Sequence, residues 1–200
     1  MNTLFSKKEL LQFGWDKTKE NFWFLFLTLI IVLIASGATG KIPFVGIIVG
    51  ILASISIITV ALEIVDGKKP IFKDLFKKYS DWKIFVNYIL ASILTALAVV
   101  VGLILLIVPG IYLAIRLQFY KYLIVDKGDI GPVDAIKESW RMTEGETWNL
   151  FLFLILIALL NIAGALLLGI GLFATIPITL LSYGLLYRKL HARLSLVKSK

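Results

Sequence analysis

The feature that most constrains this chain is a set of long apolar segments that contain no charged residue. Four such runs occur, at residues 21–40, 42–62, 84–115 and 147–187. A hydrocarbon core of about 30 Å is crossed by a helix of about 20 apolar residues. The first two runs hold one helix each, and the other two are long enough for helical hairpins. We therefore expect an all-α integral membrane protein with six transmembrane helices.

Helix-breaking residues divide each of the two longer runs. We expect Pro109 and Gly110 to act as a hinge at the tip of one hairpin. Gly169 and Gly171 are expected to divide the last run, and Pro177 to kink the helix after it. Hydrophobic residues make up 59% of the chain and charged residues only 17%, which excludes an ordinary soluble domain.

The distribution of Lys and Arg predicts the orientation of the spans. Every basic residue except Lys41 lies on a segment that six spans place on the same side of the membrane, if Arg116 is counted with the helix returning to that side. Because basic residues near helix ends stay in the cytoplasm, both termini are expected there, in a cytoplasmic (inner) membrane. The net charge of +8 is explained by this topology and by a lipid bilayer with anionic headgroups. No nucleic acid partner is expected.

A repeated motif indicates internal duplication. The stretch "WDKTKENFW" at 15–23 has the same Trp and Thr frame as "WRMTEGETW" at 140–148, and "PIFKDLFKKYSDWKIF" from Pro70 is a looser third copy. Each copy is predicted to be an amphipathic helix at the membrane surface that leads into a span, with Thr143 and Glu146 as the capping box of the next helix. Five tryptophans would anchor these elbows at the headgroup level: Trp15, Trp23, Trp82, Trp140 and Trp148.

The chain is thus expected to be one membrane domain, residues 1–200, built from three units. Their approximate bounds are 3–66, 70–126 and 132–190, each an interfacial amphipathic helix followed by an out-and-back helical pair. Because every unit has two spans, all three share one orientation. This predicts a threefold parallel repeat about an axis normal to the membrane.

Few residues suit catalysis or metal binding. The chain has no cysteine and a single histidine, His191 in the basic tail. Thiol chemistry and His-rich metal sites are therefore excluded, and we predict no cofactor and no enzyme activity. All 13 acidic residues fall on the predicted inner side or at its boundary, so paired carboxylates within the membrane are also not expected.

Arg116 is the one charge well inside a predicted span, and is therefore a candidate functional or structural residue. Glu63 is the deepest carboxylate, but a direct pair with Arg116 would be stretched. Asn161 and the carbonyl group of Phe173, left without its helical donor by Pro177, are candidate partners at a closer depth. In one interpretation Arg116 is structural and bonds these groups. In the other it binds a lipid phosphate or an anionic solute.

The segment from Leu106 to Trp148 resembles the membrane domain attached to some glycerophosphoryl diester phosphodiesterases, and related stand-alone membrane proteins. The shared features are Pro109-Gly110-Ile111, the "VD" at 125–126, Pro132, Ala135, Ser139-Trp140 and Thr143. The opening "GWDKTKENFWFL" is also similar to that family. In such proteins the hydrolase chemistry belongs to a separate soluble domain, so the resemblance implies a multi-helix membrane domain and carries no catalytic residue.

These features favour a membrane scaffold or a subunit that binds a protein partner. The cytosolic face is the expected contact surface, because the charged side chains and the tail "YRKLHARLSLVKSK" gather there. The alternative is a transporter or lipid-handling protein with an anion or phospholipid site near Arg116.

Overall fold

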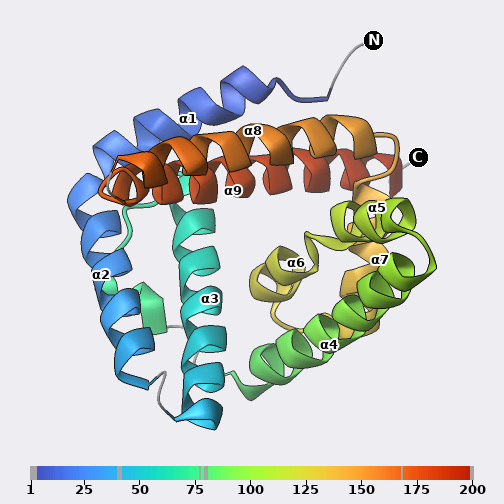
Figure 1. Cartoon of the computed structure of the whole chain (residues 1–200), viewed down its shortest axis with the longest axis horizontal. Coiled ribbons are helices and arrows are strands. Elements are labelled where there is room, and N and C mark those ends of the chain that lie inside the picture. The colour runs from blue at the N-terminus through green and yellow to red at the C-terminus, as the bar shows by residue number, and fades with distance from the viewer. Residues whose placement is uncertain (1–3, 40–41, 77, 79–80, 168, 199–200) are drawn as a thin grey trace. The chain divides into compact units, whose positions relative to one another are not determined.

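We describe the chain from a computed structural model, which covers residues 4–39, 42–76, 78, 81–167 and 169–198 (Figure 1). Within these residues every regular element is a helix. The elements are α1 (Lys7–Glu20), α2 (Phe22–Thr39), α3 (Pro43–Val65), the 3₁₀ helix η1 (Phe72–Phe76), α4 (Trp82–Leu105), α5 (Ile107–Leu117), α6 (Tyr120–Lys127), α7 (Pro132–Met142), α8 (Thr147–Leu166) and α9 (Leu172–Lys198). The expected all-α class is confirmed.

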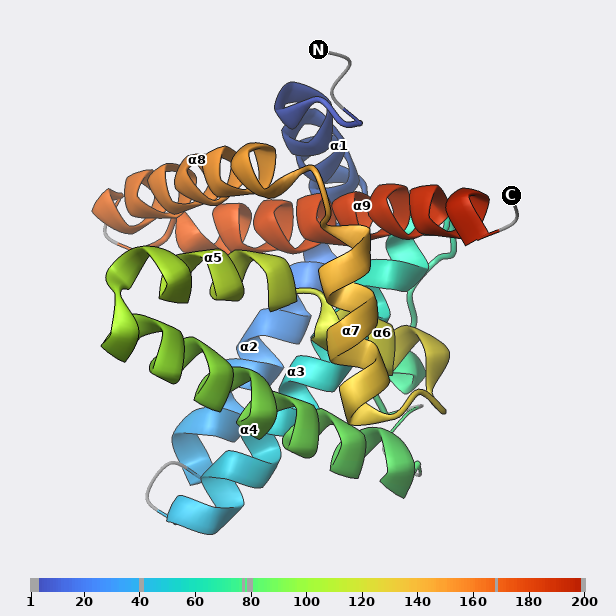
Figure 2. The same ribbon diagram turned by 90° about the vertical axis from the view of Figure 1, so that its right-hand side faces the viewer.

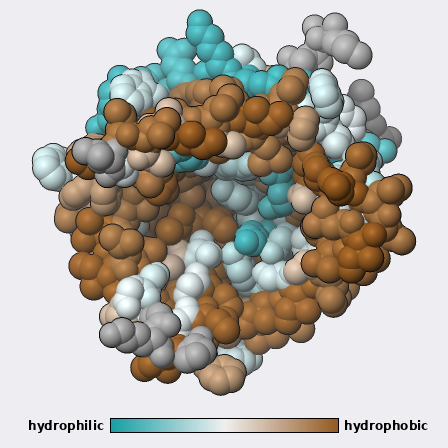
Figure 3. Space-filling view, in the orientation of Figure 1, coloured by the Kyte–Doolittle hydropathy of each residue, from teal (hydrophilic) through white to brown (hydrophobic). Residues whose placement is uncertain are grey.

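Four of these helices are long and apolar enough to cross a membrane: α2, α3, α4 and α8. Large hydrophobic side chains along them are exposed, as a lipid-facing helix requires. Figure 3 shows these hydrophobic residues in brown along the outer surfaces of α2 and α4, whereas hydrophilic residues gather over α1. The structure therefore supports a membrane protein with several apolar helices.

The described residues form two compact units. One comprises residues 5–80 and 155–186, and we call it the α1–α3 unit. In it α2 and α3 run side by side (Figure 1). Its core is formed by Leu25, Val60, Ala61, Ile64, Leu75 and Leu181. Helix α1 packs closely on α9 at Gly14, where an added Cβ would lie 2.6 Å from the carbonyl oxygen of Ile178.

The other unit comprises mainly residues 81–154 and 187–198, and we call it the α4–α7 unit. Figure 2 shows α4 and α5 folded back on each other, with α7 running across them. Phe119, Leu123 and Ile124 at the start of α6 are fully buried, as are Ala135 and Met142 of α7.

The hairpin predicted at Pro109-Gly110 has its turn slightly earlier than expected. The chain reverses at Leu106, which has extended backbone angles, and Pro109 and Gly110 lie in the first turn of α5. Proline is tolerated there because the first-turn N–H groups have no helical acceptor. Gly110 lets the two helices touch, since an added Cβ would lie 2.7 Å from the backbone nitrogen of Leu103.

The predicted fourth span is not one straight helix. It is divided into α5 and α6 at Gln118 and Phe119. The 11 residues of α5 rise only about 16 Å, which is less than the hydrocarbon thickness. The second predicted surface helix also differs from expectation, because the described residues after Pro70 form only the short 3₁₀ helix η1.

Candidate functional site

The break between α5 and α6 frees backbone groups that α7 satisfies. The Ser139 hydroxyl accepts a hydrogen bond from the Phe119 N–H at 3.1 Å and donates one to the Arg116 carbonyl oxygen at 3.0 Å. The Thr143 hydroxyl lies 3.1 Å from the same carbonyl oxygen. Ser139 and Thr143 are both fully buried. Because unpaired buried backbone groups are costly, these two side chains make the break in the helix possible.

The role of Thr143 therefore differs from the predicted helix cap. Helix α8 begins only at Thr147, and the hydroxyl of Thr143 also lies 2.8 Å from the carbonyl oxygen of Ser139 in its own helix. Glu146 accepts from the Asn149 amide at 2.8 Å and pairs with Arg193. Thr143 and Glu146 have the sequence pattern of a capping box. The Thr143 hydroxyl, however, bonds the Arg116 carbonyl group at the break between α5 and α6 and does not cap α8.

Arg116 extends from α5 onto α7 and is only 4% exposed. Its Nη1 donates to the Tyr112 hydroxyl at 3.0 Å, and its Nη2 donates to the Trp140 carbonyl oxygen at 2.7 Å. The guanidinium carbon lies 4.1 Å from the centre of the Trp140 ring, which is a cation–π contact. Within the described residues Nε has no hydrogen-bond partner, and no carboxylate pairs with this cation.

The other candidate polar residues have partners of their own. The Asn161 amide nitrogen donates to the Ile157 carbonyl oxygen at 3.0 Å and to the Thr179 hydroxyl at 2.9 Å, so it joins α8 to α9. Its Oδ1 is buried without a partner among the described residues. Glu63 lies in the last turn of α3, two residues before its end, and Pro177 lies inside α9 as predicted. The described partners of Arg116 thus come from α5 and α7, not from Asn161 or the Phe173 carbonyl group.

The predicted tryptophan anchors differ in their surroundings. Trp23, Trp82 and Trp148 are about 70% exposed, at 73%, 70% and 67%, and Trp15 is 49% exposed. Trp140 is less exposed, at 36%, because one face of its ring covers Arg116. Their placement at a membrane surface stays a prediction.

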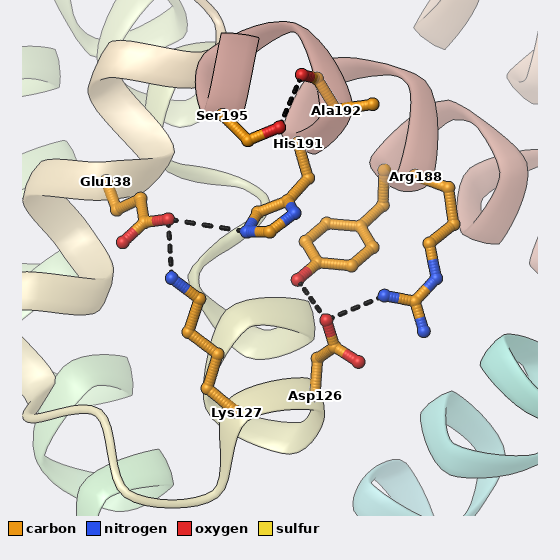
Figure 4. Close-up of polar contacts among 8 residues, drawn as sticks. Asp126, Lys127, Glu138, Arg188, His191, Ala192 and Ser195 are labelled. Carbon is orange, nitrogen blue, oxygen red and sulfur yellow. Dashed lines mark hydrogen bonds and ion pairs between the residues drawn. The ribbon is translucent and has the colours of Figure 1, made fainter. Parts of the chain in front are cut away.

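A second polar cluster joins the end of α9 to α6 and α7 (Figure 4). We call it the α9 latch, and it consists of Asp126, Lys127, Glu138, Arg188 and His191 together with Tyr187. Asp126 accepts from Arg188 at 2.7 Å and from the Tyr187 hydroxyl at 2.8 Å. Glu138 pairs with Lys127 at 2.7 Å and lies 3.5 Å from His191 Nε2. The latch thus ties three helices together through alternating charges.

The pKa values of two groups in the latch are both lowered, for different reasons. Burial alone would raise the pKa of Asp126, but the hydrogen bonds from Arg188 and Tyr187 and the charge of Arg188 outweigh it, so this pKa lies below its ordinary value. Burial lowers the pKa of His191, and the charge of Lys127 adds to this effect. The nearby carboxylates of Glu138 and Asp126 oppose that shift but do not reverse it.

Arg193 continues these contacts one turn further along α9. It pairs with Glu146 at 3.4 Å and donates to the carbonyl oxygens of Met142 and Glu144 at 3.1 and 2.6 Å. The tail from Tyr187 is therefore helical and docked as far as Arg193, and is not a free cytosolic extension. The sequence carried a usable signal for this, namely acidic residues between positions 126 and 146, on a segment predicted to lie on the same side of the membrane as the basic tail.

The α9 latch and the Arg116 contacts use their polar groups to join helices. Within the described parts of the chain, no group of three or more His, Asp or Glu side chains is arranged to hold a metal ion. The geometry thus supports a structural role, in which these polar side chains hold α7 and α9 against α5 and α6.

The family comparison covers this same region. Residues 95–194 match the model of a family described as "Protein of unknown function (DUF975)". The chain belongs to this family. The DUF975 match begins within α4 and ends one residue after Arg193, so it includes the break between α5 and α6, Arg116 and the α9 latch. No curated protein and no solved structure matches the chain.

Proposed function

We propose that this DUF975 protein is a membrane scaffold that binds a protein partner on its cytosolic face. The observation that carries the proposal is the docking of α9. The latch and Arg193 hold one face of this helix against α6, α7 and the start of α8, while Ala192, Ser195 and Leu196 on the same helix are exposed. Leu196 is 67% exposed. A rigid helix that presents an unburied apolar side chain loses little entropy when a partner covers it.

The proposed architecture is six spans in a threefold parallel repeat. Element order supports it, because α1–α3, η1–α6 and α7–α9 each begin with a short helix and continue with an apolar pair. Three side-chain hydrogen bonds also follow one pattern. Ser56 donates to the Leu75 carbonyl oxygen, Arg116 to that of Trp140, and Ser182 to that of Leu10. In each bond, the donor lies in the second apolar helix of one repeat, and the acceptor lies in the short helix that begins a repeat.

The proposed location is a cytoplasmic membrane with both termini in the cytosol, and no catalytic role is assigned. The support for the location is the placement of basic residues on the segments that would face inward. We also propose a relation to the membrane domains attached to some glycerophosphoryl diester phosphodiesterases, in which the hydrolase chemistry belongs to a separate soluble domain.

Mass spectrometry of the protein in native nanodiscs tests the partner proposal. We expect a protein partner at a fixed stoichiometry, and its loss from the variant Ala192→Arg/Leu196→Glu. The control is Lys8→Glu/Gln12→Arg on the exposed side of α1, which should keep the partner. The absence of a stoichiometric partner, or its full retention by the α9 variant, would contradict the proposal. The variants change exposed residues, so both should remain folded.

Lipid or anion handling is a second candidate, favoured by one observation. Arg116 is a buried cation without a carboxylate partner among the described residues, and its Nε is unused. A buried charge of this kind is costly unless an anion lies nearby. If a bound anionic lipid is found without a protein partner, this candidate replaces the scaffold.

A further inference from the structure

We propose that the exposed side of α7 binds the phosphate headgroup of an anionic phospholipid. This inference rests on the membrane placement of the proposed function, but not on partner binding. It deepens the second candidate, because it assigns the lipid phosphate to α7 residues in front of Trp140 and leaves Arg116 in its structural contacts.

The site is a hollow of about 320 Å³ in the α4–α7 unit, lined by Leu117, Ile136, Lys137, Trp140 and Arg141. Lys137 and Arg141 are one helical turn apart, so their side chains reach the same side of α7. Trp140 lies between them in the sequence and supplies an indole ring, which suits the headgroup level of a bilayer. Basic side chains, an indole and two apolar residues are the groups expected around a lipid headgroup.

The charges around this hollow are not neutralised by the protein. No ion pair joins Lys137 or Arg141 to a carboxylate in the described part of the chain. Glu138 is turned to Lys127 and His191 at the latch. Asp134, one turn earlier, is the acidic residue that would oppose anion binding. Arg116 places a third positive charge 4.1 Å from the centre of the Trp140 ring.

The basic residues of α1 form a contrast within the same molecule. Lys17 pairs with Glu20 at 2.6 Å and Lys19 pairs with Asp16 at 3.2 Å, beside the exposed Trp15. The segment from Trp15 to Glu20 has the same combination of two cations and a tryptophan, but here both cations have carboxylate partners. It therefore provides a matched control with the same change in net charge.

An adjacent apolar hollow indicates a lipid rather than a free phosphate. It has a volume of about 230 Å³ and is lined by Val108, Ile111, Tyr112, Ile115, Thr147, Trp148 and Phe151. The Tyr112 ring, which lines it, meets the Trp140 ring of the basic hollow edge to face at 5.7 Å. A phosphate at Lys137 and Arg141 would thus have a site for an acyl chain beside it, as an amphiphile requires.

The test uses the full-length protein in nanodiscs of phosphatidylcholine with a small fraction of phosphatidylglycerol. Native mass spectrometry would count the phosphatidylglycerol molecules retained per protein. We expect specific retention by the wild type and a loss of affinity of roughly 30-fold in Lys137→Gln/Arg141→Gln, because each surface cation contributes about a factor of five. Lys17→Gln/Lys19→Gln should change the affinity less than about threefold, because those charges are already paired.

Further comparisons distinguish a lipid site on α7 from general charge attraction and from a free-anion site. Equal loss in both double variants would show general attraction of lipid to a basic protein, and would overturn the site on α7. Displacement of phosphatidylglycerol by millimolar inorganic phosphate would show a free-anion site and overturn the lipid assignment; we expect no displacement. If the wild type fails to enter nanodiscs of pure phosphatidylcholine, the membrane placement itself fails, and this result is distinguishable from loss of the headgroup site.

Discussion

At the scale of single residues, the hydroxyl group of Ser139 satisfies two backbone groups. It accepts a hydrogen bond from the N–H of Phe119 and donates one to the carbonyl group of Arg116. It does so in a fully buried position, where water cannot replace it. The break between α5 and α6 therefore depends on a side chain in a third helix.

We predict that Ser139→Ala lowers the free energy of unfolding by about 1 to 3 kcal/mol, the cost of leaving a buried donor without an acceptor. Thr143 remains to serve the Arg116 carbonyl, so the N–H of Phe119 accounts for most of the loss. Thermal or denaturant unfolding in detergent measures the effect. The control is Ser195→Ala, whose exposed hydroxyl bonds the Ala192 carbonyl of its own helix. Equal stability of the two variants would contradict this role of Ser139.

At the scale of elements, the end of α9 is held by charges whose balance depends on pH. His191 stacks on Tyr187 with ring centres 5.6 Å apart and faces Glu138 of α7. The other charges near it are Lys127 and Asp126 of α6 and Arg188 of α9. Because burial and Lys127 lower its pKa, the docked helix favours the neutral imidazole.

We therefore predict that α9 is less stably docked as the pH falls from 7.5 to 5.5. The unfolded state binds a proton near the ordinary pKa of 6.5, whereas the folded state binds one only at lower pH, so stability falls through this window. Asp126 does not contribute to the change, because its pKa is lowered below the ordinary 3.8 and it stays ionised. Hydrogen exchange of the α9 amides, corrected for intrinsic rates, measures the docking.

The variant His191→Asn provides the control for this prediction. It keeps a polar side chain that does not titrate, so its exchange protection should change less with pH than that of the wild type. If the wild type instead becomes better protected at pH 5.5, the attraction of Glu138 for a protonated His191 outweighs burial, and the prediction is wrong.

At the scale of the whole molecule, the number of spans depends on α5 and α9. Helix α5 is short, and α9 continues from an apolar half into the basic latch. The chain contains no cysteine, so single cysteines can report topology without a background.

We predict that a cysteine at Lys68 or Asp129 reacts only with a reagent that has access to the cytosol, and that one at Ile170 reacts from the outside. Asp129→Cys distinguishes six spans from fewer. If α4 and α5 both cross, it is labelled only by a reagent that has access to the cytosol; if α4 crosses and α5 only enters the bilayer and returns, it is labelled from the outside. Labelling of Lys68→Cys and Ile170→Cys from the same side would contradict the proposed topology altogether. Labelling of intact cells with a membrane-impermeant maleimide measures this.

The sequence by itself determined the features that arise from local chemistry. Uncharged runs require helices in a membrane, because every backbone group there must be bonded within the segment. They correctly predicted the all-α class, the helices α2, α3, α4 and α8, and a proline inside α9. Pro132 correctly marked the start of α7, because proline suits the first helical turn.

Only the tertiary structure decided which polar groups meet. The pairing of Arg116 with Trp140, of Ser139 with the broken helix, and of Asp126 with Arg188 joins residues that lie 20 to 62 positions apart. No periodicity encodes such contacts, because they depend on how separate helices cross. The break at Phe119 was also not predicted, since no glycine or proline marks residues 116–121 and the hydroxyl groups that permit the break lie in α7. The partners of the basic tail were not predicted either, because they belong to other helices.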